Sequence, residues 1–446
     1  MAVPSLEAGI EAAGSPINLL WKPDAPPWNP PVVPAQFTGW AEEQSAAFKT
    51  AALSDLSHHM RDLFIKGPDA TRLLSEVSAN NYENFAVNQA KQFVPVTAEG
   101  KIVQDGILFR AAADEYILTG PPASQSWVMF HGEQGGYDVE FTDDPDSEFR
   151  PGDPVLFRYQ VQGPNALALV EQVFGGPLPD VKFFHAAEVS LEGRRIRALR
   201  HGMAGQAGYE FIGAYSDGEY LRERLLAAGQ EYGLAQVGAM AYATNGVESG
   251  WIPTPTPGIY TAPELKSYRE WLPLFSFEGQ KPLSGSYFSP NIEDYYVSPY
   301  ELGYGRSIAF NHDFIGREAL AASKDNVPRT KVTLELDQDD VREYLNAGAN
   351  YLLTYSRHRI EHQGELVGAT FYTTNIARMD RVLALSLVNN EQAAPGTEVE
   401  LVWGSHPGGE TAPDADLGFA RIRATVQASP YNEFARTKYR AKSLNA

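Results

Sequence analysis

The chain of 446 residues contains no cysteine. Disulfide bonds, thiolate nucleophiles, cysteine-ligated zinc and iron–sulfur clusters are therefore excluded. Basic residues are also scarce, because 36 lysines and arginines stand against 56 aspartates and glutamates and leave a net charge of −20. This balance argues against nucleic acid or an anionic membrane as a partner, and an anionic ligand would need a local basic pocket.

Long apolar runs are missing as well. No stretch of 18 apolar residues occurs, so no transmembrane helix is expected. Residues 1–16 carry two glutamates and no apolar core, which is unlike a secretory signal, and a cytoplasmic protein is expected. The composition, with 43% hydrophobic and 21% charged residues, is that of a folded protein. The sequence leaves the oligomeric state open.

The length predicts two or three domains rather than one core. Residues 21–34 hold six prolines, which indicates an extended N-terminal arm within residues 1–36, either a linker or a segment packed across a site. Residues 37–330 mix helical and strand patterns, which predicts an α+β region. Residues 331–446 change to short alternating strands, which predicts a C-terminal antiparallel β domain.

Within the α+β region, strand patterns and helix patterns follow one another. Strands are predicted at 60–65, 115–119, 157–162, 195–200 and 209–213, a hairpin at 92–96 and 102–109, and helices at 69–75, 124–135, 165–173 and 220–232. A strand, a Gly-Pro pair and a helix occur twice in this order, at Gly67-Pro68 and at Gly163-Pro164. This recurrence indicates internal pseudo-symmetry.

A glycine-rich stretch ends on a conspicuous acid. Gly202, Gly205 and Gly208 are three residues apart and lead to Glu210, which stands between two aromatic residues. A buried carboxylate in such a strand is costly without a partner, and two parallel N–H donors from a flat heterocycle such as a pterin would supply one. The glycines would let the backbone approach such a ring. Their spacing is not that of the dinucleotide-binding fingerprint.

Other polar and aromatic residues leave two interpretations open. Of the neighbours His58 and His59, which point to opposite faces of an extended chain, either both are structural or one polarises a substrate oxygen. Asp105 is either a turn residue or faces a site. Trp251, at the end of a stretch that begins at Tyr242, is either a core residue or a flat wall for a heterocycle.

His358 and His362 are four residues apart, as metal ligands on a helix often are, but their surroundings have a strand pattern. At about 3.3 Å per residue the two rings would be about 13 Å apart, which is too far for one ion. No metal site is expected.

Taken together, the motifs resemble the folate-dependent aminomethyltransferase family of the glycine-cleavage T-protein, and within it most of all the tetrahydrofolate-dependent aryl O-demethylases that act on vanillate, 3-O-methylgallate and syringate. The resemblance runs from about residue 35 to 430, and the stretches that carry it are 57–60, 90–96, 105–106, 162–164, 199–210, 248–253, 268–272, 291–296 and 299–305.

The resemblance implies a three-domain ring around a folate cleft with a C-terminal antiparallel β-barrel, and tetrahydrofolate as acceptor of a methyl group from a methoxylated aromatic substrate. It implies the following roles: Tyr242, His59 and Asp105 in catalysis, Glu210, Trp251 and Gln162 in folate binding, and His58 and Gln92 in substrate binding. Folate-dependent transfer from a sulfonium or amine donor, and a non-catalytic folate-binding protein, are the alternatives.

Two positions depart from the vanillate pattern. Pro30 stands where a tyrosine is expected in the N-terminal arm, and Pro121 and Pro122 follow Gly120 where an arginine for the substrate carboxylate is expected. These departures argue against vanillate as the substrate. A syringate-like acid or a methoxyphenol without a carboxylate would fit, and so would a different residue as the charge partner of the substrate carboxylate.

Overall fold

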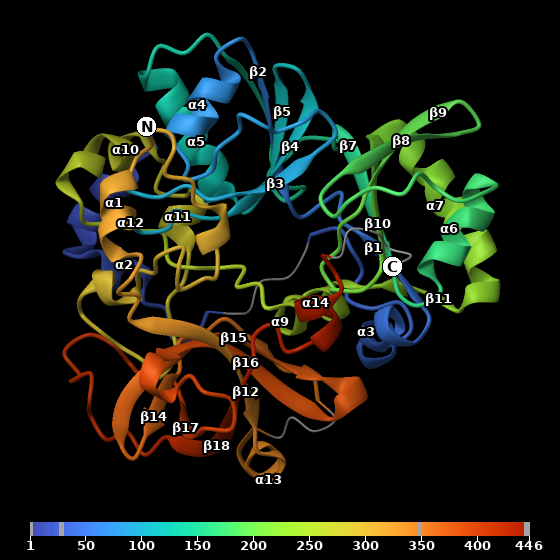
Figure 1. Ribbon diagram of the computed structural model, residues 1–446. Helices are drawn as coiled ribbons and strands as arrows, with labels where there is room; N and C mark the ends of the chain where they lie inside the picture. Colours follow the sequence, from blue (N-terminus) through green and yellow to red (C-terminus); the bar gives the residue numbers. More distant parts are fainter. Residues whose placement is uncertain (1–2, 26–30, 346–349, 441–446) are drawn as a thin grey trace.

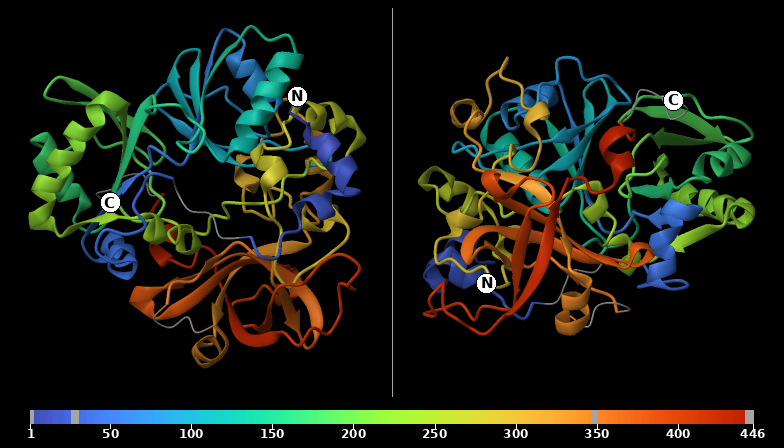
Figure 2. Two further views of the ribbon diagram at one scale, coloured as in Figure 1. Left: turned by 180° about the vertical axis from the view of Figure 1, so that it is seen from behind. Right: turned by 60° about the horizontal axis from the view of Figure 1, so that its bottom comes forward.

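The computed structural model describes residues 3–25, 31–345 and 350–440. Figure 1 shows three lobes, built on a six-stranded sheet, a five-stranded sheet and a β-barrel, with α9 (Gly246–Ser249) and α14 (Glu433–Thr437) near the place where they meet. The two further views of Figure 2 show the same three lobes. The predicted α+β class with a C-terminal barrel is confirmed.

The six-stranded sheet has the order β11-β1-β7-β10-β9-β8. Its strands are β1 (Ala51–Asp55), β7 (Leu156–Gln162), β8 (Ala186–Leu191), β9 (Arg194–Leu199), β10 (Gly208–Ala214) and β11 (Leu234–Val237). On its outer face, Tyr159, Val161 and Phe211 pack in one apolar cluster with residues of α6 (Ala166–Phe174) and α7 (Tyr215–Gly229). Side chains alternate between the faces of a strand, so the neighbouring residues Gln160 and Glu210 lie on the opposite, polar face.

The five-stranded sheet is formed by the chain that runs between β1 and β7. Its order is β3-β4-β5-β2-β6, with β2 (Arg61–Lys66), β3 (Ala90–Phe93), β4 (Gly106–Ala112), β5 (Glu115–Gly120) and β6 (Glu140–Asp144). Helices α4 (Ala70–Glu76) and α5 (Pro122–Gln134) pack against it, and the fully buried Trp127 donates its indole N–H to the Val77 carbonyl at 3.1 Å. In chain order, the five-stranded sheet is therefore an insertion between the first and second strands of the six-stranded sheet.

The repeated strand–Gly-Pro–helix unit appears once in each sheet. Gly67 follows β2 with φ +145° and Gly163 follows β7 with φ +136°. A Cβ at Gly67 would lie 2.3 Å from the Asp138 carbonyl oxygen, and one at Gly163 would lie 2.5 Å from that of Thr50. Both glycines thus allow a neighbouring backbone segment of the same protein to pass close to the end of a strand. This shared feature supports the predicted pseudo-symmetry.

The third lobe is a closed six-stranded barrel in the order β15-β14-β17-β18-β12-β16, because β15 also pairs with β16. Its strands are β12 (Arg329–Leu336), β14 (Arg359–His362), β15 (Glu365–Ile376), β16 (Arg381–Asn389), β17 (Glu398–Trp403) and β18 (Ala420–Gln427), and β13 (Leu353–Thr354) is added to β15. Its apolar cluster includes Val332, Leu334, Leu401 and Ile422.

The remaining α-helices of the described residues have ten residues or fewer. They are α1 (Leu6–Ala13), α2 (Pro16–Leu20), α3 (Trp40–Lys49), α8 (Ala239–Tyr242), α10 (Lys266–Trp271), α11 (Phe277–Gln280), α12 (Arg317–Ser323) and α13 (Gln338–Asp340). Helices α1 and α2 precede the proline-rich stretch and contact α10 and α11. None of the helices in the described ranges combines the length and the apolar character needed to cross a membrane.

Candidate functional site

Asp105 is the centre of the first polar cluster, which we call the Asp105 cluster. This carboxylate, 1% exposed, lies just before β4 and accepts hydrogen bonds from Trp251 Nε1 at 2.9 Å and Tyr304 Oη at 2.9 Å. It also accepts from the side-chain amides of Gln92, at the second-last position of β3, and Gln104, the latter at 3.2 Å. Three of the residues named from the sequence, Asp105, Trp251 and Gln92, are thus brought together.

The electrostatics of this cluster are finely balanced. Burial raises the pKa of the Asp105 carboxyl, while the hydrogen bonds from Trp251 and Tyr304 and the charge of Lys331 oppose that rise. Burial also lowers the pKa of Lys331 to about 8, and its ammonium group donates to the backbone carbonyls of Gly250 and Leu302, both at 2.7 Å. Lys331 therefore ties the loop before Trp251 to the loop before Tyr304.

Glu210 belongs to a second cluster, the Glu210 cluster, which joins the two sheets. Arg158 on β7, 6% exposed, donates from Nη1 to Glu210 Oε1 at 3.0 Å. The same guanidinium donates to both oxygens of Asp62 on β2, at 3.0 and 3.1 Å, and to Thr119 Oγ1 on β5 at 2.8 Å. No hydrogen bond to Glu210 Oε2 is found among the described residues, so this oxygen is available to a ligand.

The glycine turn, residues 200–208, is held against β7. Gln160 Oε1 accepts from the Met203 amide at 3.0 Å, and Gln162 Oε1 accepts from the Ala204 amide at 2.9 Å. Gln162 Nε2 in turn donates to the Gln206 carbonyl at 2.6 Å. Gln162 therefore supports the turn that leads to Glu210.

The structure gives a different reason for glycine at these positions from the one inferred from the sequence. A Cβ at Gly202 would lie 1.9 Å from Gln162 Nε2, and one at Gly208 would lie 2.0 Å from the Val161 carbonyl oxygen. At these two positions the close approach is to β7 and its side chains, whereas approach to a heterocyclic ring was expected.

His59 and Tyr242 form a third feature. His59 Nε2 and Tyr242 Oη are 2.8 Å apart, and the rings meet edge to face with centroids 4.7 Å apart. Burial lowers the pKa of His59 to about 3, so its ring is neutral at physiological pH. Burial also raises the pKa of Tyr242, which keeps its hydroxyl protonated. The pair thus holds a proton that can be donated to an oxygen in the site.

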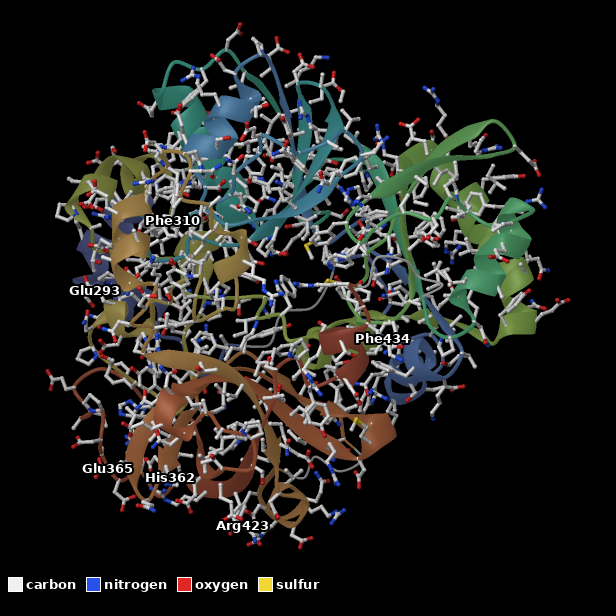
Figure 3. All side chains as sticks on the ribbon, in the orientation of Figure 1. Glu293, Phe310, His362, Glu365, Arg423 and Phe434 are labelled. Carbon is white, nitrogen blue, oxygen red and sulfur yellow. The ribbon has the colours of Figure 1, made fainter. Side chains whose placement is uncertain are left out.

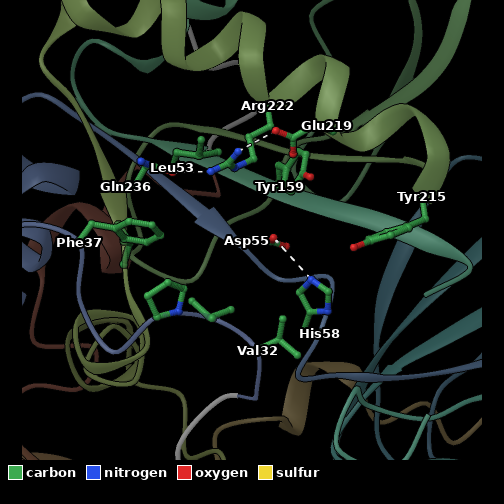
Figure 4. A pocket seen from close by; sticks show the side chains of 13 residues that line it. Val32, Phe37, Leu53, Asp55, His58, Tyr159, Tyr215, Glu219, Arg222 and Gln236 are labelled. Carbon is green, nitrogen blue, oxygen red and sulfur yellow. Dashed lines mark hydrogen bonds and ion pairs between the residues drawn. The ribbon is translucent and has the colours of Figure 1, made fainter. Parts of the chain in front are cut away.

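His58 points away from His59, but the two residues lie in a turn at 57–59 and not in the extended chain that was expected. Its Nδ1 is 2.9 Å from Ser147 Oγ and its Nε2 is 3.8 Å from Asp55 Oδ2. Figure 4 shows it among the side chains that line a cavity, together with Phe37 and with Arg222 of α7. The volume of this cavity is about 230 Å³. This cavity lies on the α7 side of the six-stranded sheet, opposite to Glu210. The structure therefore separates His58 from Gln92, although the same role was predicted for both.

The structure describes one of the two positions that depart from the vanillate pattern. Pro30 lies outside the described residues. Pro121 caps α5 directly after Gly120, whose φ of +155° brings its backbone close to Gly106, so the expected arginine position is the start of a helix.

His358 and His362 do not share a site. The ring of His358 stacks on Trp403 with centroids 4.2 Å apart, whereas His362 Nδ1 bonds to the Glu398 carbonyl at 2.9 Å on the outer side of the barrel (Figure 3). Within the described ranges, no three His, Asp or Glu side chains are placed to hold a metal ion.

Sequence reasoning missed Arg158, Tyr304 and Lys331. Arg158 had a signal, because Arg158, Gln160 and Gln162 occupy alternate positions of β7 and so place three polar side chains on one face. Tyr304 lies in the stretch 299–305 that carries the resemblance, although no role was predicted for it. Lys331 had no signal, since it reaches its cluster through tertiary packing.

Comparison with known proteins gives a consistent picture. The family model described as the GCVT N-terminal domain matches residues 24–255. Syringate O-demethylase of Sphingobium sp. (strain NBRC 103272 / SYK-6) is 37% identical over 98% of this chain and 97% of its own length. Sesamin methylene transferase of Sinomonas sp. (strain No.22) is 28% identical, over 90% of each chain.

Among solved structures, the glycine cleavage system aminomethyltransferase T from Bartonella henselae superposes with a TM-score of 0.63 at 17% sequence identity, covering 90% of this chain and 92% of that one. This likeness confirms the fold.

Proposed function

This chain belongs to the GCVT family of aminomethyltransferases, and from that premise we propose that it is a tetrahydrofolate-dependent aryl O-demethylase acting on a syringate-like methoxylated aromatic. The observation that carries the proposal is the His59–Tyr242 hydrogen bond of 2.8 Å, because a protonated donor is what removal of a methyl group from an aryl ether oxygen requires. The near full-length similarity to a syringate O-demethylase supports it.

The acceptor side fits a pterin in its chemistry. Glu210 keeps one carboxylate oxygen for N–H donors while Arg158 holds the other, and such charge-assisted pairs are strong and directional. Trp251, fixed through its indole N–H by Asp105, offers a flat surface for stacking. Tetrahydrofolate, when bound, supplies the N5 amine that accepts the methyl group and gives 5-methyltetrahydrofolate.

The residues of this chain would act on the donor as follows. Tyr242 Oη donates a hydrogen bond to the aryl ether oxygen and transfers its proton as the bond between the methyl carbon and this oxygen breaks. The neutral ring of His59 holds the hydroxyl in place and orients it. Asp105 would orient the amine and take up the proton that N5 loses when it gains the methyl group, because burial raises the pKa of this carboxyl. Exchange with solvent would then remove this proton from Asp105 and return one to Tyr242, so that the overall transfer balances. Alignment of the reacting atoms in a dry site supplies much of the remaining acceleration.

The test is incubation of the purified protein with tetrahydrofolate and a panel of aromatic donors, with 5-methyltetrahydrofolate and the demethylated phenol measured by chromatography. Equal amounts of both products from a methoxylated aromatic are expected. Turnover only with a sulfonium or N-methyl amine, or folate binding without turnover, would contradict the proposal. A methylenedioxy donor belongs in the panel, because a relative is named a sesamin methylene transferase.

Four expectations from the sequence stay predictions: the roles of the site residues, the division at residues 36 and 330, the cytoplasmic location, and the lack of nucleic-acid and membrane partners. No particular oligomeric state is proposed.

A further inference from the structure

The C-terminal segment, residues 429–440, leaves the barrel after β18 and packs against α9 and the glycine turn. Helix α14 lies between the barrel and the six-stranded sheet (Figures 1 and 3). The Asn432 amide donates to the Glu248 carbonyl of α9 at 3.1 Å. A Cβ at Gly205 would lie 3.1 Å from the Ala435 side chain, so the segment rests directly on the glycine turn.

The end of this segment is anchored at the glycine turn. Tyr439 Oη donates to the Gly202 carbonyl at 2.6 Å, and its ring meets Phe183 edge to face at 5.1 Å. The Arg440 guanidinium lies 5.6 Å from the centre of the same Phe183 ring. Anchoring Tyr439 therefore fixes where the next residue, Arg440, presents its charge.

Arg440 differs from Arg158 and Arg378 in that no anionic partner of its guanidinium is found among the described residues. Arg158 is used by Asp62 and Glu210, and Arg378 makes a two-pronged ion pair with Glu248. Arg440 is exposed, and no hydrogen bond or ion pair of its guanidinium is found in the part of the chain that the structure describes.

The charge of Arg440 acts on both polar clusters. Burial is the main cause of the lowered pKa of Lys331 and of His201, and Arg440 lowers both further. Lys331 is bound to the loops of the Asp105 cluster, while the pKa of His201 also responds to the charge of Glu210. The guanidinium therefore lies within electrostatic reach of both clusters.

A protein of net charge −20 needs a local cation to bind an anion. Both reactants of the proposed reaction carry carboxylates, in the glutamate tail of tetrahydrofolate and in a syringate-like acid, and the start of α5 offers no arginine for either. We propose that Arg440, held by Tyr439, is the carboxylate-binding residue of the cleft. This inference rests on the proposed function for the identity of the reactants.

Equilibrium binding tests it without requiring turnover. Dissociation constants of the full-length protein are measured for tetrahydrofolate and for 6-methyltetrahydropterin, which lacks the tail, and for syringate and a dimethoxyphenol, which lacks the carboxylate. We expect Arg440→Ala to weaken binding of one carboxylate-bearing ligand about tenfold while its counterpart without the carboxylate binds as before. Arg440→Lys should restore part of the loss.

Lys438→Ala is the matched control, because it removes the same charge from an exposed position two residues earlier. A loss confined to tetrahydrofolate assigns Arg440 to the tail, and a loss confined to syringate assigns it to the aromatic acid. Unchanged binding of both acids, or an equal loss with and without the carboxylate, would overturn the inference. Failure of the wild-type protein to demethylate any aromatic would instead reject the proposed function, while the binding comparison still decides the role of Arg440.

Discussion

At the scale of single residues, Glu210 shows what a sequence reveals and what it conceals. An acid between two aromatic residues in a strand is conspicuous, because a buried carboxylate without a partner is unfavourable. The sequence does not reveal that Arg158 is its partner, since Arg158 lies 52 residues earlier and meets Glu210 only through the pairing of β7 with β10. Asp105 was also singled out, but its contacts come from Gln92, Trp251 and Tyr304, which no local pattern connects.

The proton donor can be tested by Tyr242→Phe. The change removes only the hydroxyl that bonds to His59, so turnover should fall about 100-fold or more while the dissociation constant of tetrahydrofolate stays unchanged. Single-turnover kinetics and equilibrium binding measure the two quantities. Tyr300→Phe is the control, since that hydroxyl bonds to the Leu320 carbonyl. Unchanged turnover in the Tyr242 variant would remove this residue from the mechanism.

The folate-binding role of Glu210 can be tested by Glu210→Gln. Glutamine keeps an acceptor for Arg158 but loses the charge, so affinity for tetrahydrofolate should fall about 10- to 100-fold, as for loss of a charged hydrogen bond. Glu188→Gln, an exposed change on β8 of the same sheet, should leave affinity unaltered. Equal dissociation constants for the wild-type protein and the Glu210 variant would refute the assignment.

At the scale of elements, the local pattern was a good guide. The predicted strand 157–162 corresponds to β7 (Leu156–Gln162), and the predicted helix 165–173 to α6 (Ala166–Phe174). Alternating or helical spacing of apolar residues is a local property, which explains this agreement. The requirement for glycine at positions 202 and 208 could not be read from the local sequence. It arises because the neighbouring strand β7 leaves no space for a side chain there.

Gly208→Ala tests that constraint. A methyl group there would meet the Val161 carbonyl oxygen, and φ of +150° is unfavourable for alanine, so β10 must shift and Glu210 must move with it. A loss of stability of about 3 kcal/mol or more is expected, together with weaker folate binding. The control is Gly176→Ala, which has a φ of +158° but open space around it and should show only the backbone strain. Urea unfolding measures both, and equal losses would show that contact with β7 is unimportant.

At the scale of the whole molecule, the order of the lobes was beyond pattern reading. The resemblance implied a ring of three domains, but the insertion of the five-stranded sheet between β1 and β7 is a matter of strand pairing between distant segments. Function arises at this scale too. The Glu210 cluster joins the two sheets, and the Asp105 cluster gathers residues from three separate parts of the chain, so neither exists within one lobe.

Acid stability is a property of the whole assembly, because buried histidines occur in more than one lobe. Burial lowers the pKa of His59 and of His358 to about 3 and that of His131 to about 4, from 6.5. Below pH 6.5 the unfolded chain binds protons that the folded chain cannot, so the free energy of unfolding should fall as the pH falls from 6.5 toward 4. Each histidine contributes up to about 1.4 kcal/mol per pH unit in this window.

His358→Gln isolates one of these contributions in the barrel, away from the proposed chemistry. Urea unfolding at pH 7, 6 and 5 should show that the variant loses less stability toward acid than the wild-type protein, by up to about 1.4 kcal/mol per pH unit. His362→Gln, on the outer side of the same barrel, is the matched control and should follow the wild-type slope. If the His358 variant also followed that slope, the His358 ring would already be protonated in the folded barrel, and its burial against Trp403 would not oppose its charge.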